Sequence, residues 1–92
     1  MAITIRIPTP LRRLTGNMDV VSVDANSVGS CVEELERSYP GLKERLCDET
    51  GELRRFVNIS VNGEDVRFLQ GLATAITDRD EVSIVPAVAG GA

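Results

Sequence analysis

The stretch that decides the fold is Phe56-Val57-Asn58-Ile59-Ser60-Val61-Asn62-Gly63. Its aliphatic residues alternate with polar ones up to residue 61, which is the pattern of a strand with one buried face. Asn62-Gly63 favours a tight hairpin turn, because both residues tolerate a positive φ. We therefore expect a strand over residues 56–61 and a short partner strand over residues 66–68.

Two more strands are predicted before this hairpin. Isoleucines alternate with polar residues over 3–7, and valines do so over 21–24, so each segment has the two-residue period of a half-buried strand. Pro8 and Pro10 end the first strand, because proline cannot donate a hydrogen bond to a sheet. Residues 12–17 are expected to form a loop, so that the two strands make an opening hairpin.

One main helix is predicted between the second and third strands. Its apolar stripe has helical spacing and consists of Val28, Cys31, Val32 and Leu35. Asn26 or Ser27 fits the N-cap, and a start one turn later also fits, because Ser30 and Glu33 match a capping box. The helix is expected to end before Pro40, and a short helical turn over residues 42–46 follows it.

The last strand is expected over residues 82–88, after a turn at Asp78-Arg79-Asp80. Leu72 and Ile76 lie between the hairpin and this strand, and we expect both to pack under the core. The predicted order is strand, strand, helix, strand, strand, strand. This order indicates an α+β fold with one helix across one face of a sheet.

The composition excludes several classes of function. The 92 residues suffice for one domain, and the net charge of −4 argues against nucleic acid or an anionic membrane as a partner. The chain has no histidine, and Cys31 and Cys47 form no metal or redox motif, so we expect unreactive thiols and no metal site. No signal peptide or membrane-length apolar segment is found, so the expected location is cytoplasmic.

The chain ends in Val85-Pro86-Ala87-Val88-Ala89-Gly90-Gly91-Ala92. Two adjacent glycines lack a Cβ, so this strip of backbone is thin enough to enter a narrow channel in another protein. Removal of Ala92 would leave an unhindered carboxylate on Gly91. We therefore expect a folded domain over residues 1–86 and a flexible C-terminal tail over residues 87–92.

Several stretches of the chain carry a resemblance to a known family. They are Arg55-Phe56-Val57-Asn58-Ile59-Ser60-Val61-Asn62-Gly63 with Val66-Arg67, Leu72 with Asp78-Arg79-Asp80-Glu81-Val82, and Ile84-Val85-Pro86-Ala87-Val88-Ala89-Gly90-Gly91. Nearly the whole chain resembles the ubiquitin-like β-grasp sulfur carriers of the MoaD/ThiS family. These include the small subunits of molybdopterin synthase and the thiamin sulfur carriers. With Leu35-Glu36 and residues 39–46 included, it most resembles the carrier that supplies cysteine biosynthesis in actinobacteria.

The resemblance implies a fold and a carrier function. The fold would be a mixed sheet of four to five strands packed on one main helix, with a projecting tail. A ubiquitin-activating-like adenylyltransferase would use ATP to adenylate the carboxylate of Gly91, and a sulfur donor would then convert it to a thiocarboxylate. Reach and contacts inside a partner would come from Pro86, Ala87, Val88, Ala89 and Gly90. The chain itself would bind no cofactor and would be a cosubstrate, not an enzyme.

The same resemblance implies the further partners of the cysteine pathway. A pyridoxal-phosphate-dependent cysteine synthase, a sulfhydrylase, would take sulfur from the carrier. A metalloprotease would then release the cysteine formed on it.

Ala92 departs from the family pattern, in which the reactive glycine is terminal. Three explanations are open: a protease removes Ala92 from a precursor, Ala92 is an addition from recombinant expression, or Ala92 itself carries the sulfur. We favour the precursor, because a terminal methyl group would crowd a site shaped for glycine. The metalloprotease of the cysteine pathway is then a candidate for cutting after Gly91.

Other functions compete with this one. The sulfur could instead serve molybdopterin synthesis, with the chain as the small subunit of the synthase, or serve a thiamin-type pathway. A function of another class is a ubiquitin-like modifier, in which Gly91 forms isopeptide bonds with lysines of target proteins. A plain interaction domain with an unmodified tail ranks below these.

A docking surface is expected on the sheet face opposite the helix. If the aliphatic residues of 57–61 face the helix, Phe56 points outward. Together with Arg54 and Arg55 it would form a small patch for a partner protein.

Overall fold

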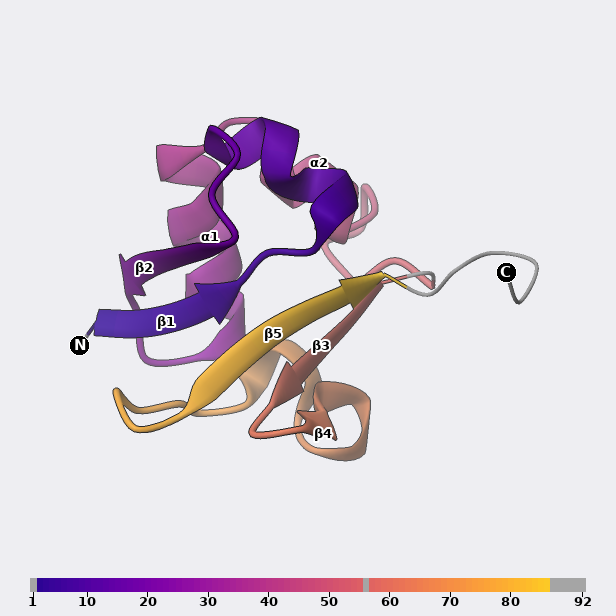
Figure 1. The fold of residues 1–92 in the computed structure, drawn as a ribbon. Coiled ribbons are helices and arrows are strands. Elements are labelled where there is room, and N and C mark those ends of the chain that lie inside the picture. The colour runs from indigo at the N-terminus through magenta and orange to yellow at the C-terminus, as the bar shows by residue number, and fades with distance from the viewer. Residues whose placement is uncertain (1, 56, 87–92) are drawn as a thin grey trace.

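The described residues, 2–55 and 57–86, form a mixed five-stranded sheet with helix α1, Val28–Ser38, across one face (Figure 1). In this computed structural model the strand order is β2-β1-β5-β3-β4, with β1 parallel to β5 and the other neighbours antiparallel. The strands are β1 Ala2–Arg6, β2 Val20–Asp24, β3 Val57–Val61, β4 Glu64–Asp65 and β5 Glu81–Pro86. The predicted α+β fold, mixed sheet and opening hairpin are confirmed.

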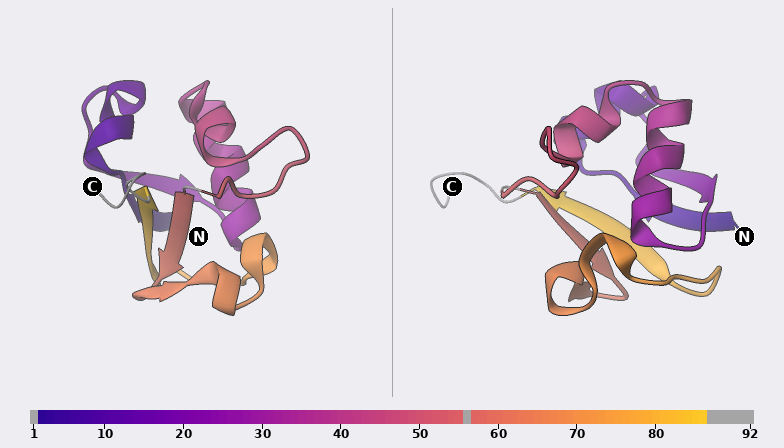
Figure 2. Two further views of the ribbon diagram at one scale, coloured as in Figure 1. Left: turned by 90° about the vertical axis from the view of Figure 1, so that its right-hand side faces the viewer. Right: turned by 180° about the vertical axis from the view of Figure 1, so that it is seen from behind.

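The core lies between the sheet and α1, which lies against one face of the sheet (Figure 2). Alternate strand residues are buried, and they are Ile3, Ile5, Val21, Val23, Val57, Ile59, Val61, Val82 and Ile84. The predicted helical stripe is buried as well. Each such aliphatic side chain contributes about 1.5–3 kcal/mol on burial. Ile76 is buried and Leu72 packs against the same core, as predicted.

The start of α1 is set by a reciprocal pair of serines. The Ser27 side chain accepts a hydrogen bond from the Ser30 backbone N–H at 3.1 Å, and the Ser30 hydroxyl accepts one from the Ser27 N–H at 3.0 Å. This capping box satisfies two backbone donors that the first helical turn cannot satisfy. Of the starts left open by the sequence, Ser27 is the N-cap, and Ser30 belongs to the first turn.

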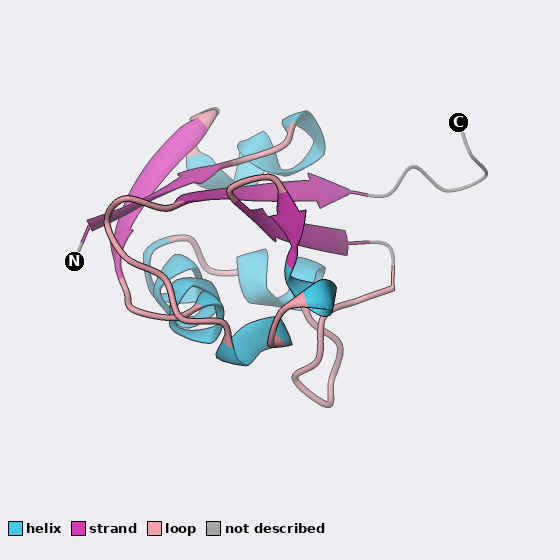
Figure 3. Cartoon of the chain, turned by 90° about the horizontal axis from the view of Figure 1, so that it is seen from below, coloured by secondary structure: helices cyan, strands magenta, loops and turns pink. Residues whose placement is uncertain are grey.

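The predicted strand over residues 66–68 is wrong. The hairpin turn forms as expected, with φ of 55° at Asn62 and 85° at Gly63, but β4 has only two residues and leads into a 3-10 helix over Val66–Phe68 (Figure 3). The cause is Asp65, whose carboxylate accepts a hydrogen bond from the Arg67 backbone N–H at 2.8 Å. Such a bond curls the backbone and competes with sheet pairing.

The segment after β1 is also more regular than expected. A 3-10 helix spans Thr9–Thr15, where a loop over residues 12–17 was predicted. The helix begins at Thr9, and Pro10 fits its first turn, because proline at the start of a helix loses no hydrogen bond. The buried Thr15 hydroxyl lies within hydrogen-bond distance of two backbone carbonyls, of Arg12 at 3.1 Å and Met18 at 2.9 Å, and so links the helix to the turn that follows.

The short helix α2, Leu42–Leu46, follows α1 as predicted. Its first turn is held by Glu36 of α1, whose carboxylate accepts hydrogen bonds from the backbone N–H groups of Gly41 and Lys43 at 3.1 and 3.0 Å. Leu42 and Leu46 are buried, so α2 adds to the core beside α1.

Candidate functional site

The candidate site is the end of β5 and the start of β3, because the predicted reactive tail continues directly from β5. The last described residue is Pro86. The predicted tail and processing residues Ala87, Val88, Ala89, Gly90, Gly91 and Ala92 lie outside the described residues, as does Phe56 of the predicted docking patch. Strand β5 was expected to run to residue 88, and its described part ends at Pro86.

The end of β5 extends past its neighbour β1. The pairs between β1 and β5 run from Thr4↔Glu81 to Arg6↔Ser83. The pairs between β3 and β5 continue to Val57↔Pro86. Val85 and Pro86 therefore pair with β3 only, and Figures 1 and 2 show β3 beginning beside the end of β5.

Pro86 fits the strand because its position needs no N–H. The Val57 N–H donates to the carbonyl of Arg54 at 3.1 Å, and the Val57 carbonyl accepts from the Arg67 side chain at 2.8 Å. Val57 thus turns both backbone groups away from β5, which makes Val57↔Pro86 a non-hydrogen-bonded pair of the antiparallel ladder. The missing donor of proline costs nothing there.

The Arg67 guanidinium lies against the outer edge of the first residues of β3. Nη2 donates to the carbonyls of Arg54 and Val57, each at 2.8 Å, and Nη1 donates to the side-chain oxygen of Asn58. Nη1 also lies 3.8 Å from the carboxylate of Asp65. Sequence reasoning missed this role, because Arg67 was assigned to a strand. The Asp65-Val66-Arg67 turn was the signal that could have revealed it.

Two of the three residues of the predicted docking patch, Arg54 and Arg55, lie among the described residues. Arg54 and Arg55 are exposed, but the Arg54 Nε donates to the Glu44 carbonyl at 2.9 Å and so leans toward α2. On the outer face of β5, Val85 is 46% exposed. Phe68, at 82% exposed, is the most exposed large apolar residue in the described part of the chain. The sequence reasoning did not single it out, because it was expected on a strand.

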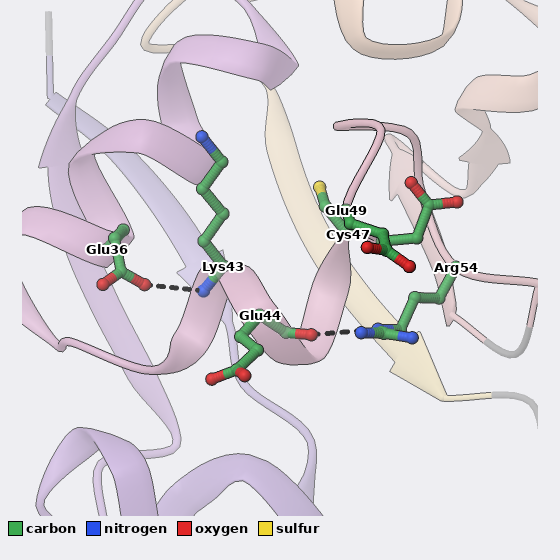
Figure 4. Close-up of a pocket in the computed structure, with 7 residues that line it drawn as sticks. Glu36, Lys43, Glu44, Cys47, Glu49 and Arg54 are labelled. Atoms are coloured by element: carbon green, nitrogen blue, oxygen red, sulfur yellow. Dashed lines mark hydrogen bonds between the residues drawn. The ribbon is translucent and has the colours of Figure 1, made fainter.

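A hollow of about 650 Å³ lies beside α2 (Figure 4). Its lining residues are Glu36, Lys43, Glu44, Cys47, Asp48, Glu49 and Arg54. Cys47 is its only sulfur nucleophile among the described residues, and burial raises the pKa of that thiol. Glu36 is already used by the α2 backbone. Of the groups that line the hollow, the Cys47 thiol is therefore protonated at neutral pH, and the Glu36 carboxylate is occupied in holding α2.

Cys31 is buried on the helical stripe, as predicted, and Cys47, which was expected only to be unreactive, is buried as well. Burial raises the pKa of Cys31 to about 11, and it also raises the pKa of Cys47. At neutral pH both are thiols, and the thiolate is the reactive form. Within residues 2–55 and 57–86, no cluster of three or more His, Cys, Asp or Glu is arranged to hold a metal. No helix in this part of the chain is long and apolar enough to cross a bilayer.

Comparison with known proteins assigns the chain to a family. The ThiS family model matches residues 5–91. The sulfur carrier protein CysO of Mycobacterium tuberculosis is 54% identical over 99% of this chain and 100% of its own length. Small archaeal modifier protein 3 of Haloferax volcanii is 39% identical with the same coverage.

A solved structure agrees in both sequence and shape. The structure of the BexX/CysO complex of Amycolatopsis orientalis contains a chain that matches with a TM-score of 0.91 at 43% identity. The match covers 98% of this chain and 100% of that one. This chain therefore belongs to the ThiS family of ubiquitin-like proteins.

Proposed function

We propose that this protein is a sulfur carrier for cysteine biosynthesis and that Gly91 is its reactive residue. The observation that carries the proposal is the 54% identity to the sulfur carrier protein CysO across essentially the full length of both chains. The family match extends through residue 91. A carrier of this kind is a cosubstrate, and its chemistry comes from its own terminal carboxylate together with partner enzymes.

The proposed chemistry has two steps. First, the Gly91 carboxylate attacks the α-phosphorus of ATP on a ubiquitin-activating-like adenylyltransferase, which forms an acyl-adenylate and releases pyrophosphate. Second, sulfide attacks the acyl carbon and the bond to AMP breaks, which leaves a thiocarboxylate. When a persulfide attacks instead, AMP leaves and an acyl disulfide forms, and a second thiol then cleaves its S–S bond to give the thiocarboxylate and a new disulfide. Adenylation is needed because a free carboxylate is a poor electrophile.

The geometry at the end of β5 suits this chemistry. The described part of the chain holds β5 in the sheet up to Pro86. An extended chain spans roughly 3.3–3.6 Å per residue, so the segment from Pro86 to Gly91 can reach about 20 Å. The globule can then dock outside a partner while Ala87, Val88, Ala89 and Gly90 line a channel that leads to its active site.

Two further partners complete the proposal. A pyridoxal-phosphate-dependent sulfhydrylase would accept the sulfur, and a metalloprotease would free the cysteine from the carrier. Both would act in the cytoplasm. The assignment to sulfur transfer is supported by the M. tuberculosis relative, which is named a sulfur carrier protein. In the A. orientalis structure, a CysO chain lies in a complex with another protein, BexX.

Removal of Ala92 is part of the proposal. A methyl group and an extra residue after Gly91 would place the carboxylate one residue too far along a channel fitted to glycine. We expect the chain ending at Gly91 to be adenylated well and the chain ending at Ala92 to be adenylated poorly.

ATP–pyrophosphate exchange with the activating enzyme of the same cell measures this difference. A Gly91→Ala variant of the shortened chain is the matched control, since it restores the methyl group without the extra length. Equal exchange rates for the chains ending at Gly91 and Ala92 would contradict the need for processing.

A second candidate is a protein modifier. It is favoured by the 39% identity to small archaeal modifier protein 3. Mass spectrometry of the protein from its own cells separates the two: thiocarboxylate or added cysteine on Gly91 supports the carrier, and branched peptides joined to target lysines support the modifier. Sulfur on Gly91 without any cysteine adduct would favour the molybdopterin or thiamin pathways instead.

A further inference from the structure

We infer that Arg67 is a positioning residue that holds the end of β5, and with it the starting point of residues 87–92, ready for capture by the activating enzyme. This inference rests on the proposed function. It concerns a residue far from Gly91 in the sequence, which acts on the tail through β3.

The need for such a device follows from the sheet topology. β4 pairs with β3 only at Ser60↔Asp65 and Val61↔Glu64. The first two residues of β3, Val57 and Asn58, therefore have β5 on one side and no paired strand on the other. These are the two residues that pair with Pro86 and Val85, which extend past β1. At Val85 and Pro86, from which the tail continues, the sheet is therefore only two strands wide.

The Arg67 side chain takes the place of the missing strand at this corner. Its Nη2 donates to the Arg54 and Val57 carbonyls at 2.8 Å, and Nη1 donates to the Asn58 side chain. The guanidinium thereby joins the loop before β3 to the strand itself. Backbone carbonyls at an open strand edge otherwise face water and fray easily.

Arg67 is itself held in place. Its backbone N–H donates to the Asp65 carboxylate, and the same carboxylate faces its guanidinium. The 3-10 helix over Val66–Phe68 is what brings the side chain back across the start of β3. The side chain is 37% exposed, so its hydrogen bonds are partly shielded from water.

The geometry calls for arginine. Three oxygen acceptors converge on one planar group, and a guanidinium offers several N–H donors in a fixed plane. The single ammonium of lysine can approach one or two of these oxygens but does not match their layout. We call the hydrogen bonds from the Arg67 guanidinium to Arg54, Val57 and Asn58 the Arg67 clamp. Arg67→Lys therefore keeps the positive charge and removes the clamp.

Loss of the clamp has a distinctive kinetic consequence. A partner that captures an extended tail must order it, and a loose starting point adds to that cost. Once the tail is bound, the carboxylate meets the same catalytic groups. We therefore expect Arg67→Lys and Arg67→Ala to raise the KM for the carrier by about three- to tenfold, with kcat nearly unchanged.

The experiment joins amide hydrogen exchange of the full chain to adenylation kinetics of the chain ending at Gly91. Because Val57↔Pro86 is a non-hydrogen-bonded pair, Asn58↔Val85 and Ser60↔Ser83 are hydrogen-bonded pairs. In Arg67→Lys the Val85 amide should exchange at least tenfold faster, while the Ser83 amide, flanked by β1, keeps its rate. Asn58→Ala removes one acceptor with Arg67 intact and should act in the same direction more weakly.

Arg6→Ala is the matched control. It removes the exposed Arg6–Glu81 ion pair of 3.0 Å at the opposite end of β5, and it should leave both the Val85 amide and KM unchanged. Equal acceleration at Val85 and Ser83, or an unchanged KM in Arg67→Lys, overturns the inference while wild-type adenylation still supports the carrier. If the wild-type chain ending at Gly91 is not adenylated at all, the proposed function fails, and the inference fails with it.

Discussion

Val57 lies opposite Pro86 in the last described pair between β3 and β5, and its backbone bonds are made to Arg54 and Arg67 instead of to Pro86. A proline can therefore end the central strand without leaving a broken ladder. The sheet is complete up to the residue from which the candidate reactive tail continues.

This pairing predicts opposite outcomes for two neighbouring positions. Pro86→Ala should change the free energy of unfolding by less than about 1 kcal/mol, because no ladder bond is gained or lost. Val85→Pro removes the N–H of a hydrogen-bonded pair and should cost about 3 kcal/mol or more. Urea unfolding of the two variants tests the assignment, and a Val85→Pro variant that is as stable as Pro86→Ala would contradict it.

The serine pair at the start of α1 predicts a moderate loss of stability. Ser27→Ala removes the acceptor for the Ser30 N–H and should cost about 1 kcal/mol. Ser38→Ala, at the exposed far end of the same helix, should stay within about 0.5 kcal/mol of wild type. Thermal and urea unfolding measure both, and a Ser27→Ala variant as stable as Ser38→Ala would exclude the cap.

Asp80 predicts an acid-dependent component of stability. Its carboxylate accepts hydrogen bonds from the Asn62 side chain and the Thr77 N–H, and these lower its pKa from 3.8. Because the folded pKa is below the unfolded one, the stabilisation is fully present above about pH 4. It is lost as the pH falls from 3.8 through the lowered value.

The corresponding variant is Asp80→Asn. It should be less stable than wild type at pH 7, and the difference should shrink as the pH falls below 3.8. Asp78→Asn, an exposed neighbour in the same turn, is the control and should change little. A constant difference between Asp80→Asn and wild type from pH 7 down to pH 2 would argue against the linkage.

The buried cysteines predict that sulfur transfer needs no side-chain thiol. Burial keeps Cys31 and Cys47 protonated at neutral pH, so the native protein should resist iodoacetamide at pH 7 and react fully once unfolded. A Cys31→Ala/Cys47→Ala chain ending at Gly91 should still accept sulfur. If that chain folds but no longer accepts sulfur, a persulfide on cysteine would replace the thiocarboxylate in the account.

Most of the fold was predictable because its signals are local. The period-two pattern located β1, β2 and β3, and Asn62-Gly63 located the hairpin turn. The segment Val66–Phe68 was not predictable from alternation alone, since the Asp65 side chain redirects its backbone. Alternation of Val66 and Phe68 imitates a strand, and the hydrogen bond outweighs it.

The candidate site was only half accessible from the sequence. The Gly-Gly pair can be read directly in the sequence. The hydrogen bonds that hold the start of β3 beside the end of β5, in contrast, join residues that lie far apart in the chain. Arg67 reaches Arg54, which is 13 residues away, and Asn58, which is 9 away. No spacing rule connects such positions, so this role emerges only once the short β4 and the open edge of β3 are known.

The central claim is that the Gly91 carboxylate carries sulfur after Ala92 has been removed. The most direct measurement is the intact mass and C-terminal fragmentation of the protein isolated from its own cells. The account predicts a chain ending at Gly91 in which one oxygen is replaced by sulfur, accompanied by a form bearing cysteine. A chain that retains Ala92 and an unmodified carboxylate while the cells are assimilating sulfur would contradict it.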